Sequence, residues 1–186
     1  MRHCVIVGQP NTGKTLFLFQ FAAYLGLSVL DLRRLEPEGR WTGTHRTRRL
    51  QSVEVRFPLR KSLRAVRLTD TPGLTDDVHQ EVEVRRAMAA ALQAFREAGL
   101  VLHMLDAARA GELGAGAAIG QIDRQIATYA SLRGPYAVLA NKIDLPLARG
   151  GVEVIAREFP GRRVIPISAL ERHGFREVKA FVWRNA

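Results

Sequence analysis

Two short motifs carry the residues of this chain that could do chemistry. The first, Gly8-Gln9-Pro10-Asn11-Thr12-Gly13-Lys14-Thr15, fits the pattern G-x-x-x-x-G-K-[ST]. Glycines in this pattern let the backbone curl so that successive N–H groups point at phosphate oxygens, and the following helix adds its positive end. A hydrophobic strand pattern precedes the motif and a helical pattern follows it, which is the required context. The motif therefore predicts a phosphate-binding loop over residues 8–15.

The polar side chains of this loop predict separate contacts. Lys14 is expected to bridge the β- and γ-phosphates, and the Thr15 hydroxyl is expected to ligate Mg²⁺. The chain has only four lysines among its 28 basic residues, so a lysine at position 14 indicates a need for a compact ammonium rather than a planar guanidinium. The remaining expected contacts to the nucleotide in this loop come from Gly8, Asn11, Thr12 and Gly13.

The second motif, Asn141-Lys142-Ile143-Asp144, fits N-K-x-D and follows a buried strand pattern. The Asp144 carboxylate is suited to accept hydrogen bonds from guanine N1–H and N2–H₂, whereas adenine has no donor at N1. Asn141 is expected to tie this loop to the phosphate loop, and the stem of Lys142 to lie over the base. The tripeptide Ser168-Ala169-Leu170 follows the last predicted strand and is expected to place a backbone N–H on guanine O6. These residues predict selection of guanine.

A third group of residues, Asp70-Thr71-Pro72-Gly73, follows another strand pattern. Asp70 is placed to hold Mg²⁺ through water. Gly73 has no side chain to keep its backbone N–H away from a γ-phosphate. By itself this sequence also suits a type I or II turn. Its place between the two nucleotide motifs favours the functional interpretation.

Strand and helix patterns alternate along the chain and position these motifs. We predict an α/β fold with a doubly wound, mostly parallel six-stranded sheet, one antiparallel edge strand, and helices on both faces. The Ala110 to Gly116 segment is interpreted as a connector. Strands are predicted at 3–8, 52–57, 63–68, 100–105, 136–140 and 163–167, and helices at 14–25, 78–98, 119–132, 152–159 and 175–183. The inward residues of the 78–98 helix are predicted to be Val82, Met88, Ala89, Leu92 and Phe95.

The bulk properties describe a single domain over residues 1–186 with an unusual charge. No apolar run approaches the ~20 residues that span a bilayer. Cys4 is the only cysteine, so no intrachain disulfide forms. We interpret it as a buried strand residue in a cytoplasmic protein. The net charge of +10 suggests a polyanionic partner, with RNA or the ribosome ahead of anionic lipid; a bias of composition toward arginine is the alternative.

Taken in order, the four motifs resemble the Era-like branch of the translation-factor-related (TRAFAC) P-loop GTPases. The resemblance covers essentially the whole chain, as a single G domain. It implies binding of GTP, hydrolysis to GDP and phosphate, and a requirement for Mg²⁺. It also implies two nucleotide-dependent switch segments, switch I at about 30–49 and switch II at about 70–85.

The chain departs from the family pattern in both switches. The resemblance implies a switch I threonine that reaches Mg²⁺ in the GTP state. Thr42, Thr44 and Thr47 all fall in this segment, and Thr44, followed by two basic residues, is the expected catalytic and metal-binding one. Leu74 stands where Ras-like relatives carry a glutamine that orients the attacking water, so we expect slow intrinsic turnover. In family members that carry a hydrophobic residue in place of this glutamine, an asparagine at the position of Asn11 helps to hold K⁺. Asn11 is therefore a candidate K⁺ ligand, and the alternative is that it only shapes the loop.

The segment 33–67 holds 11 Arg or Lys residues against three Glu. It is either an RNA- or ribosome-facing surface or a solvated loop. A nucleotide-dependent dimer or an activating partner would fit the class. Two other functions stay open: a guanine-nucleotide-binding regulatory module that does not hydrolyse GTP, and a detached G domain of a membrane transport system.

Overall fold

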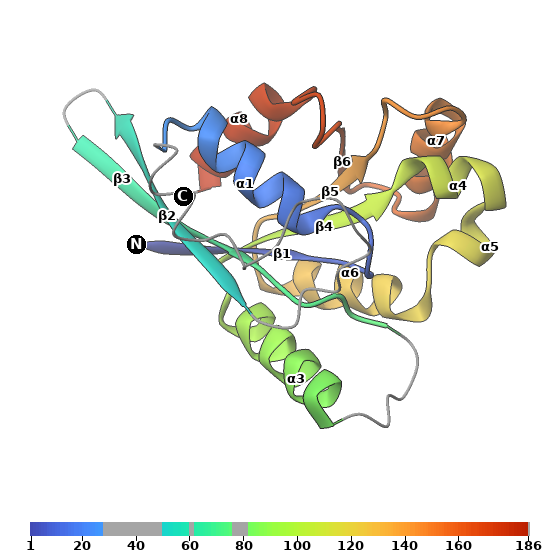
Figure 1. The fold of residues 1–186 in the computed structure, drawn as a ribbon, viewed down its shortest axis with the longest axis horizontal. Coiled ribbons are helices and arrows are strands. Elements are labelled where there is room, and N and C mark those ends of the chain that lie inside the picture. The colour runs from blue at the N-terminus through green and yellow to red at the C-terminus, as the bar shows by residue number, and fades with distance from the viewer. Residues whose placement is uncertain (28–49, 60–61, 76–81, 186) are drawn as a thin grey trace.

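The computed structural model describes residues 1–27, 50–59, 62–75 and 82–185. These residues form one six-stranded sheet in the order β2-β3-β1-β4-β5-β6, in which only the β2–β3 pair is antiparallel. This arrangement confirms the predicted fold class (Figure 1). No helix in the described part of the chain is both long enough and apolar enough to span a membrane. The strands are β1 (Arg2–Val7), β2 (Gln51–Leu59), β3 (Ser62–Asp70), β4 (Leu100–Asp106), β5 (Tyr136–Asn141) and β6 (Arg163–Pro166).

The helices cover both faces of the sheet (Figure 1). They are α1 (Lys14–Tyr24), α3 (Val82–Glu97), α4 (Ala107–Leu113), α5 (Ala115–Ala118), α6 (Gln121–Arg133), α7 (Ala148–Glu158) and α8 (Phe175–Asn185). Because side chains alternate between the two faces of a strand, β1 contributes to two separate cores. Its Cys4 and Ile6 pack with α1 and α8, and its Val5 and Val7 pack with α3, α6 and α7.

The core on the α1 side is built around stacked aromatic rings. The ring centroids of Phe17 and Phe21 on α1 lie 5.0 Å apart, and each ring meets Phe175 of α8 edge-on at 5.4 Å. These contacts hold the first turn of α1 against the sheet, directly after the phosphate loop. Cys4 is fully buried in this core, as predicted, and burial raises the pKa of its thiol above the ordinary value.

Two predictions about individual segments were wrong. The Gly/Ala-rich segment from Ala110 to Gly116 is not a connector, because most of it lies in α4 and α5. Alanine has the highest helix propensity, and Asp106 caps α4 by accepting the Arg109 backbone N–H at 3.0 Å. On α3, Ala89 and Leu92 are exposed, because the helix turns a strip of small residues toward the sheet. The buried residues of α3 among those described are Ala87, Ala91, Ala94 and Phe95.

Helices α4 and α7 pack against each other at glycines. A Cβ atom on Gly111 would lie 2.0 Å from the carbonyl oxygen of Leu147, and one on Gly151 would lie 1.7 Å from that of Ala107. Neither contact is sterically allowed, so glycine is required at both positions. This close approach matters for the site, since α4 follows β4 and α7 follows the Asn141–Asp144 loop.

Replacing Gly151 by alanine should destabilise the protein, and replacing the neighbouring Gly150 should not. Gly151→Ala forces backbone apart and is expected to lower the free energy of unfolding by about 2 kcal/mol or more. Gly150 has no atom within 4 Å of its ideal Cβ position, so Gly150→Ala should stabilise α7 by about 1 kcal/mol through helix propensity. Urea unfolding of both variants measures the difference, and equal effects at the two positions would contradict the packing described here.

Candidate nucleotide-binding site

The phosphate loop lies between β1 and α1, at the carboxyl end of the sheet where open α/β proteins bind ligands. Its two terminal glycines have backbone conformations that other residues rarely adopt, with φ of 146° at Gly8 and 94° at Gly13. A Cβ on Gly8 would lie 2.3 Å from the carbonyl oxygen of Met104, and one on Gly13 would lie 2.5 Å from Nδ2 of Asn141. Both glycines are therefore needed for the loop to pack against β4 and β5.

Lys14 is buried at the start of α1, and its ammonium group folds back over the loop. Its Nζ donates hydrogen bonds to the carbonyl oxygens of Gly8 at 3.1 Å and Gln9 at 2.7 Å. Burial lowers the pKa of Lys14 to about 8, against the opposing charges of Asp70 and Asp123. Among the described residues, the direct hydrogen-bond partners of this buried ammonium are carbonyl dipoles, so it is electrostatically suited to an incoming anion.

Thr15 and Asp70 meet as the sequence motifs require. The Thr15 hydroxyl donates to Oδ2 of Asp70 at 2.5 Å, and Asp70 is fully buried. Burial raises the pKa of Asp70 to about 6, although Lys14, Thr15 and the Thr71 backbone favour the charged form. Its other oxygen, Oδ1, is buried and has no hydrogen-bond partner among the described residues. An orphaned carboxylate oxygen beside a hydroxyl is a donor set that fits Mg²⁺.

The segment after β3 packs directly on the phosphate loop. Thr71 donates to the carbonyl oxygen of Ile6 through both its backbone N–H, at 3.3 Å, and its hydroxyl, at 2.9 Å. A Cβ on Gly73 would lie 2.6 Å from the backbone nitrogen of Pro10. The Leu74 N–H then donates to the carbonyl oxygen of Gly8 at 3.1 Å, and the Leu74 side chain is fully buried. The Leu74 side chain is thus turned into the core.

Asn141 joins the predicted guanine-recognition loops to the phosphate loop. Its Nδ2 donates to the carbonyl oxygen of Thr12 at 2.7 Å, and its Oδ1 accepts the Ala169 N–H at 2.9 Å. The expected link between Asn141 and the phosphate loop is therefore present. Ser168 and Ala169 are buried beside it, whereas the side chain of Leu170 is exposed.

Lys142 and Asp144 lie in the loop that follows β5. Lys142 adopts a positive φ of 69° and donates to Oδ2 of Asp106 at 2.6 Å. The Ile143 N–H donates to the carbonyl oxygen of Ile167 at 3.2 Å, which anchors the loop, and Asp144 is half-buried. Asp106 was missed by sequence reasoning. An aspartate at the end of a strand pattern, directly before an alanine-rich segment, is the helix-capping signal that would have revealed it.

The remaining predicted positions are Asn11, the switch I threonine and the switch segments. Asn11 is exposed in the loop with a φ of 62°. Thr44 lies outside the described residues, together with Thr42 and Thr47, so the threonine assignment stays a prediction. The whole of the predicted switch I, about 30–49, and residues 76–81 of the predicted switch II also lie outside the described residues.

The fold and these loops define a P-loop nucleotide-binding protein. A family model described as "50S ribosome-binding GTPase" matches residues 3–142. The chain belongs to this family, and the predicted class of Era-like TRAFAC GTPases is confirmed. The family is one of GTPases.

Individual relatives agree with this assignment. The tRNA modification GTPase MnmE of Cupriavidus metallidurans is 32% identical over 173 residues, which cover 89% of this chain and 33% of the relative. The chain thus spans about a third of the length of its curated relatives. A crystal structure of Era from Aquifex aeolicus bound to GDP and AlF₄⁻ superposes with a TM-score of 0.70 at 24% identity, covering 100% of this chain and 57% of Era. Era in complex with MgGDPNP and a segment of 16S ribosomal RNA superposes with a TM-score of 0.69 at 24% identity, covering 99% of this chain and 56% of Era. These two likenesses concern the fold.

Replacing Asp70 by asparagine should separate two effects of its buried charge: the loss of stability that it causes in the nucleotide-free protein, and the binding of Mg²⁺ that it supports. Because folding raises its pKa from 3.8 to about 6, its contribution to stability falls as the pH rises through that window. Asp70→Asn should therefore stabilise the nucleotide-free protein at pH 7.5 by about 2 kcal/mol, and the gain should shrink at pH 5, where the wild-type carboxyl is protonated. Mg²⁺-dependent stabilisation by GDP should be lost. Thermal unfolding with and without Mg²⁺ and GDP checks both; a variant that keeps its Mg²⁺ dependence would contradict this role.

Proposed function

We propose that the chain is a Mg²⁺-dependent molecular switch that binds GTP and hydrolyses it to GDP and phosphate. One observation carries the proposal: the Asn141 side chain connects the N-K-x-D loop to Thr12 of the phosphate loop with a single 2.7 Å hydrogen bond. A base held at Asp144 and phosphates held at Lys14 would then belong to one nucleotide. A carboxylate at Asp144 that faces the base favours guanine over adenine.

The residues of the phosphate side have distinct proposed roles. Lys14 and the loop N–H groups from Gly8 to Thr15 offset negative charge on the phosphates in the ground state and, more strongly, in the transition state. Gly73, packed on Pro10, would present its backbone N–H to the γ-phosphate. Thr15, Asp70 and Thr44 would hold Mg²⁺, which would neutralise charge on the β- and γ-phosphates. Loss of the γ-phosphate would release the two switch segments.

The attacking water needs a group other than Leu74, because that side chain is fully buried. Asn11 is exposed on the loop beside the phosphate-binding backbone. We propose that Asn11 helps to hold K⁺ there, where a cation would stabilise the charge that develops on the transferred phosphoryl group.

Hydrolysis of GTP should therefore be faster in KCl than in NaCl at matched ionic strength. We expect a stimulation of about tenfold or more, and its loss in Asn11→Ala. Multiple-turnover phosphate release measures both. Equal rates in the two salts would remove K⁺ from the mechanism, and tight GTP binding without turnover in either salt would favour the non-hydrolysing regulatory module, which the buried Leu74 supports.

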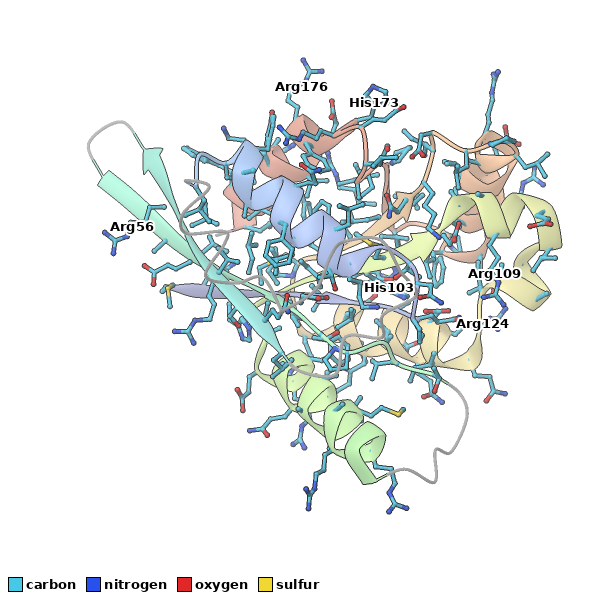
Figure 2. The ribbon with its side chains drawn as sticks, viewed as in Figure 1. Arg56, His103, Arg109, Arg124, His173 and Arg176 are labelled. Atoms are coloured by element: carbon cyan, nitrogen blue, oxygen red, sulfur yellow. The ribbon has the colours of Figure 1, made fainter. Side chains whose placement is uncertain are left out.

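The same proposal includes RNA or the ribosome as the partner and the cytoplasm as the location. The family description names ribosome binding, and the lone thiol Cys4 suits a reducing compartment. Within the described part of the 33–67 segment, Arg56 and Arg67 are exposed on the face of the β2–β3 hairpin opposite its buried valines. Figure 2 shows Arg56 directed away from the hairpin.

Removing these two cations should weaken binding to a single-stranded RNA oligonucleotide regardless of its sequence. For Arg56→Ala/Arg67→Ala we expect the slope of log K against log salt to fall by roughly 1 to 2. Arg157→Ala/Arg176→Ala is the matched control, since it also removes two exposed arginines, each of which pairs with a glutamate, but on α7 and α8. Filter binding at several salt concentrations gives the slopes. Equal losses from both sites would mean that only net charge matters.

A further inference from the structure

Four polar side chains meet inside the core that α3, α6 and α7 form with the sheet. Gln9 comes from the phosphate loop, His103 from β4, Asp123 from α6 and Tyr136 from β5. His103 and Asp123 are completely buried, and Figure 2 shows His103 in the interior of the molecule. None of the four belongs to the motifs that predicted the nucleotide site, apart from Gln9 as a variable position of the phosphate loop.

Asp123 is the centre of this cluster and accepts three hydrogen bonds. Its Oδ2 accepts Nε2 of Gln9 at 2.5 Å and the backbone N–H of Gly120, at the start of α6, at 3.0 Å. Its Oδ1 lies 2.9 Å from Nε2 of His103. These hydrogen bonds outweigh desolvation and keep the pKa of Asp123 below its ordinary value. The carboxylate is therefore charged and its acceptor capacity is used.

His103 serves as the rigid support of that carboxylate. Since Asp123 only accepts hydrogen bonds when ionised, Nε2 of His103 carries the proton. The other ring nitrogen, Nδ1, makes a hydrogen bond with the Tyr136 hydroxyl at 2.9 Å. Every polar atom of the imidazole is thus satisfied. The ring has one orientation, and the Asp123 carboxylate has a fixed direction toward the phosphate loop.

Gln9 is held at both ends. Its side-chain amide binds Asp123, while its carbonyl oxygen accepts the Lys14 ammonium at 2.7 Å and the Thr12 hydroxyl at 2.9 Å. The position of this carbonyl therefore depends on the Gln9 side chain and in turn sets where the Lys14 ammonium rests. The negative charge of Asp123 also favours the protonated form of Lys14. A purely structural role in capping α6 would require only the Gly120 contact.

We propose that Asp123 is a positioning residue for the phosphate half of the site, acting through Gln9. By fixing Gln9, the Asp123 carboxylate holds the phosphate loop and the Lys14 ammonium ready for the nucleotide before it binds. This inference rests on the proposed nucleotide-binding function. It predicts a weaker hold on the phosphates with unchanged recognition of the base, because Asn141 and Asp144 lie outside the cluster.

The first test removes the link from the side of the loop. Gln9→Met keeps the length of the side chain and loses its amide, so we expect affinity for GDP with Mg²⁺ to fall about tenfold. The ratio of GTP to ITP affinity, which reports on the base contacts, should stay within about twofold of wild type. Tyr136→Phe is the control. It removes a buried hydroxyl two hydrogen bonds further from the loop, so it should cost thermal stability and change GDP affinity less than twofold.

The second test exchanges donor and acceptor. Gln9→Glu places two carboxylates against each other and should weaken GDP binding more than Gln9→Met does. Adding Asp123→Asn restores a donor–acceptor pair, so the double variant should regain at least tenfold in affinity over Gln9→Glu alone. The charge at position 9 is the same in both variants, so the recovery reports on the contact with position 123.

Calorimetry with GDP, GTP and ITP on the folded variants decides between the outcomes. A loss in Gln9→Glu that Asp123→Asn does not relieve would overturn the inference, as would a Tyr136→Phe loss equal to that of Gln9→Met. If wild type itself failed to bind guanine nucleotides, the proposed function would fall instead. Normal wild-type binding with unaffected Gln9 variants would remove the positioning role alone.

Discussion

The site depends on one side-chain amide, that of Asn141. Three loops leave the carboxyl ends of β1, β5 and β6, and none of them has regular secondary structure to hold it in place. Asn141 donates to Thr12 in the first loop and accepts from Ala169 in the third. An amide carries a donor and an acceptor on one rigid plane, so a single residue on β5 sets the spacing of all three loops. The distance between the phosphate loop and the N-K-x-D loop is built into the protein in this way.

The phosphate side of the site contains buried charged groups whose desolvation is unfavourable. Lys14 and Asp70 are both buried, and burial shifts the pKa of each toward its neutral form. Their mutual attraction offsets only part of this desolvation. Phosphates and a divalent cation would supply the missing counter-charges to the ammonium and to the orphaned Oδ1 of Asp70. A site arranged like this gains more from its ligands than a site whose charges are already paired.

Close backbone approach is the second constraint on the architecture. Gly8 and Gly13 allow the phosphate loop to touch β4 and Asn141, and Gly73 allows the segment after β3 to touch Pro10. On the far side of the site, Gly111 and Gly151 let α4 and α7 meet. At four of these positions a Cβ would push two backbones apart, and at Gly13 it would collide with the Asn141 side chain. The loops are therefore held by packing as well as by hydrogen bonds, which gives well-defined geometry without long regular elements.

The sequence by itself determined the class of fold, the phosphate loop, Asp70 and the N-K-x-D loop. These features follow from local rules: residue type at fixed spacing, and hydrophobic patterns that alternate between strand and helix. It could not give the helical state of the segment after Asp106 or the true inward face of α3, because small residues suit both a loop and a close helix contact until the neighbouring element is known. Nor could it give the Gln9–Asp123–His103 cluster. These residues are far apart along the chain, and each one, considered alone, could be an ordinary surface or core residue. Only the parallel pairing of β1, β4 and β5 brings them together, because the burial of a charged group and the identity of its partners are properties of the packed structure.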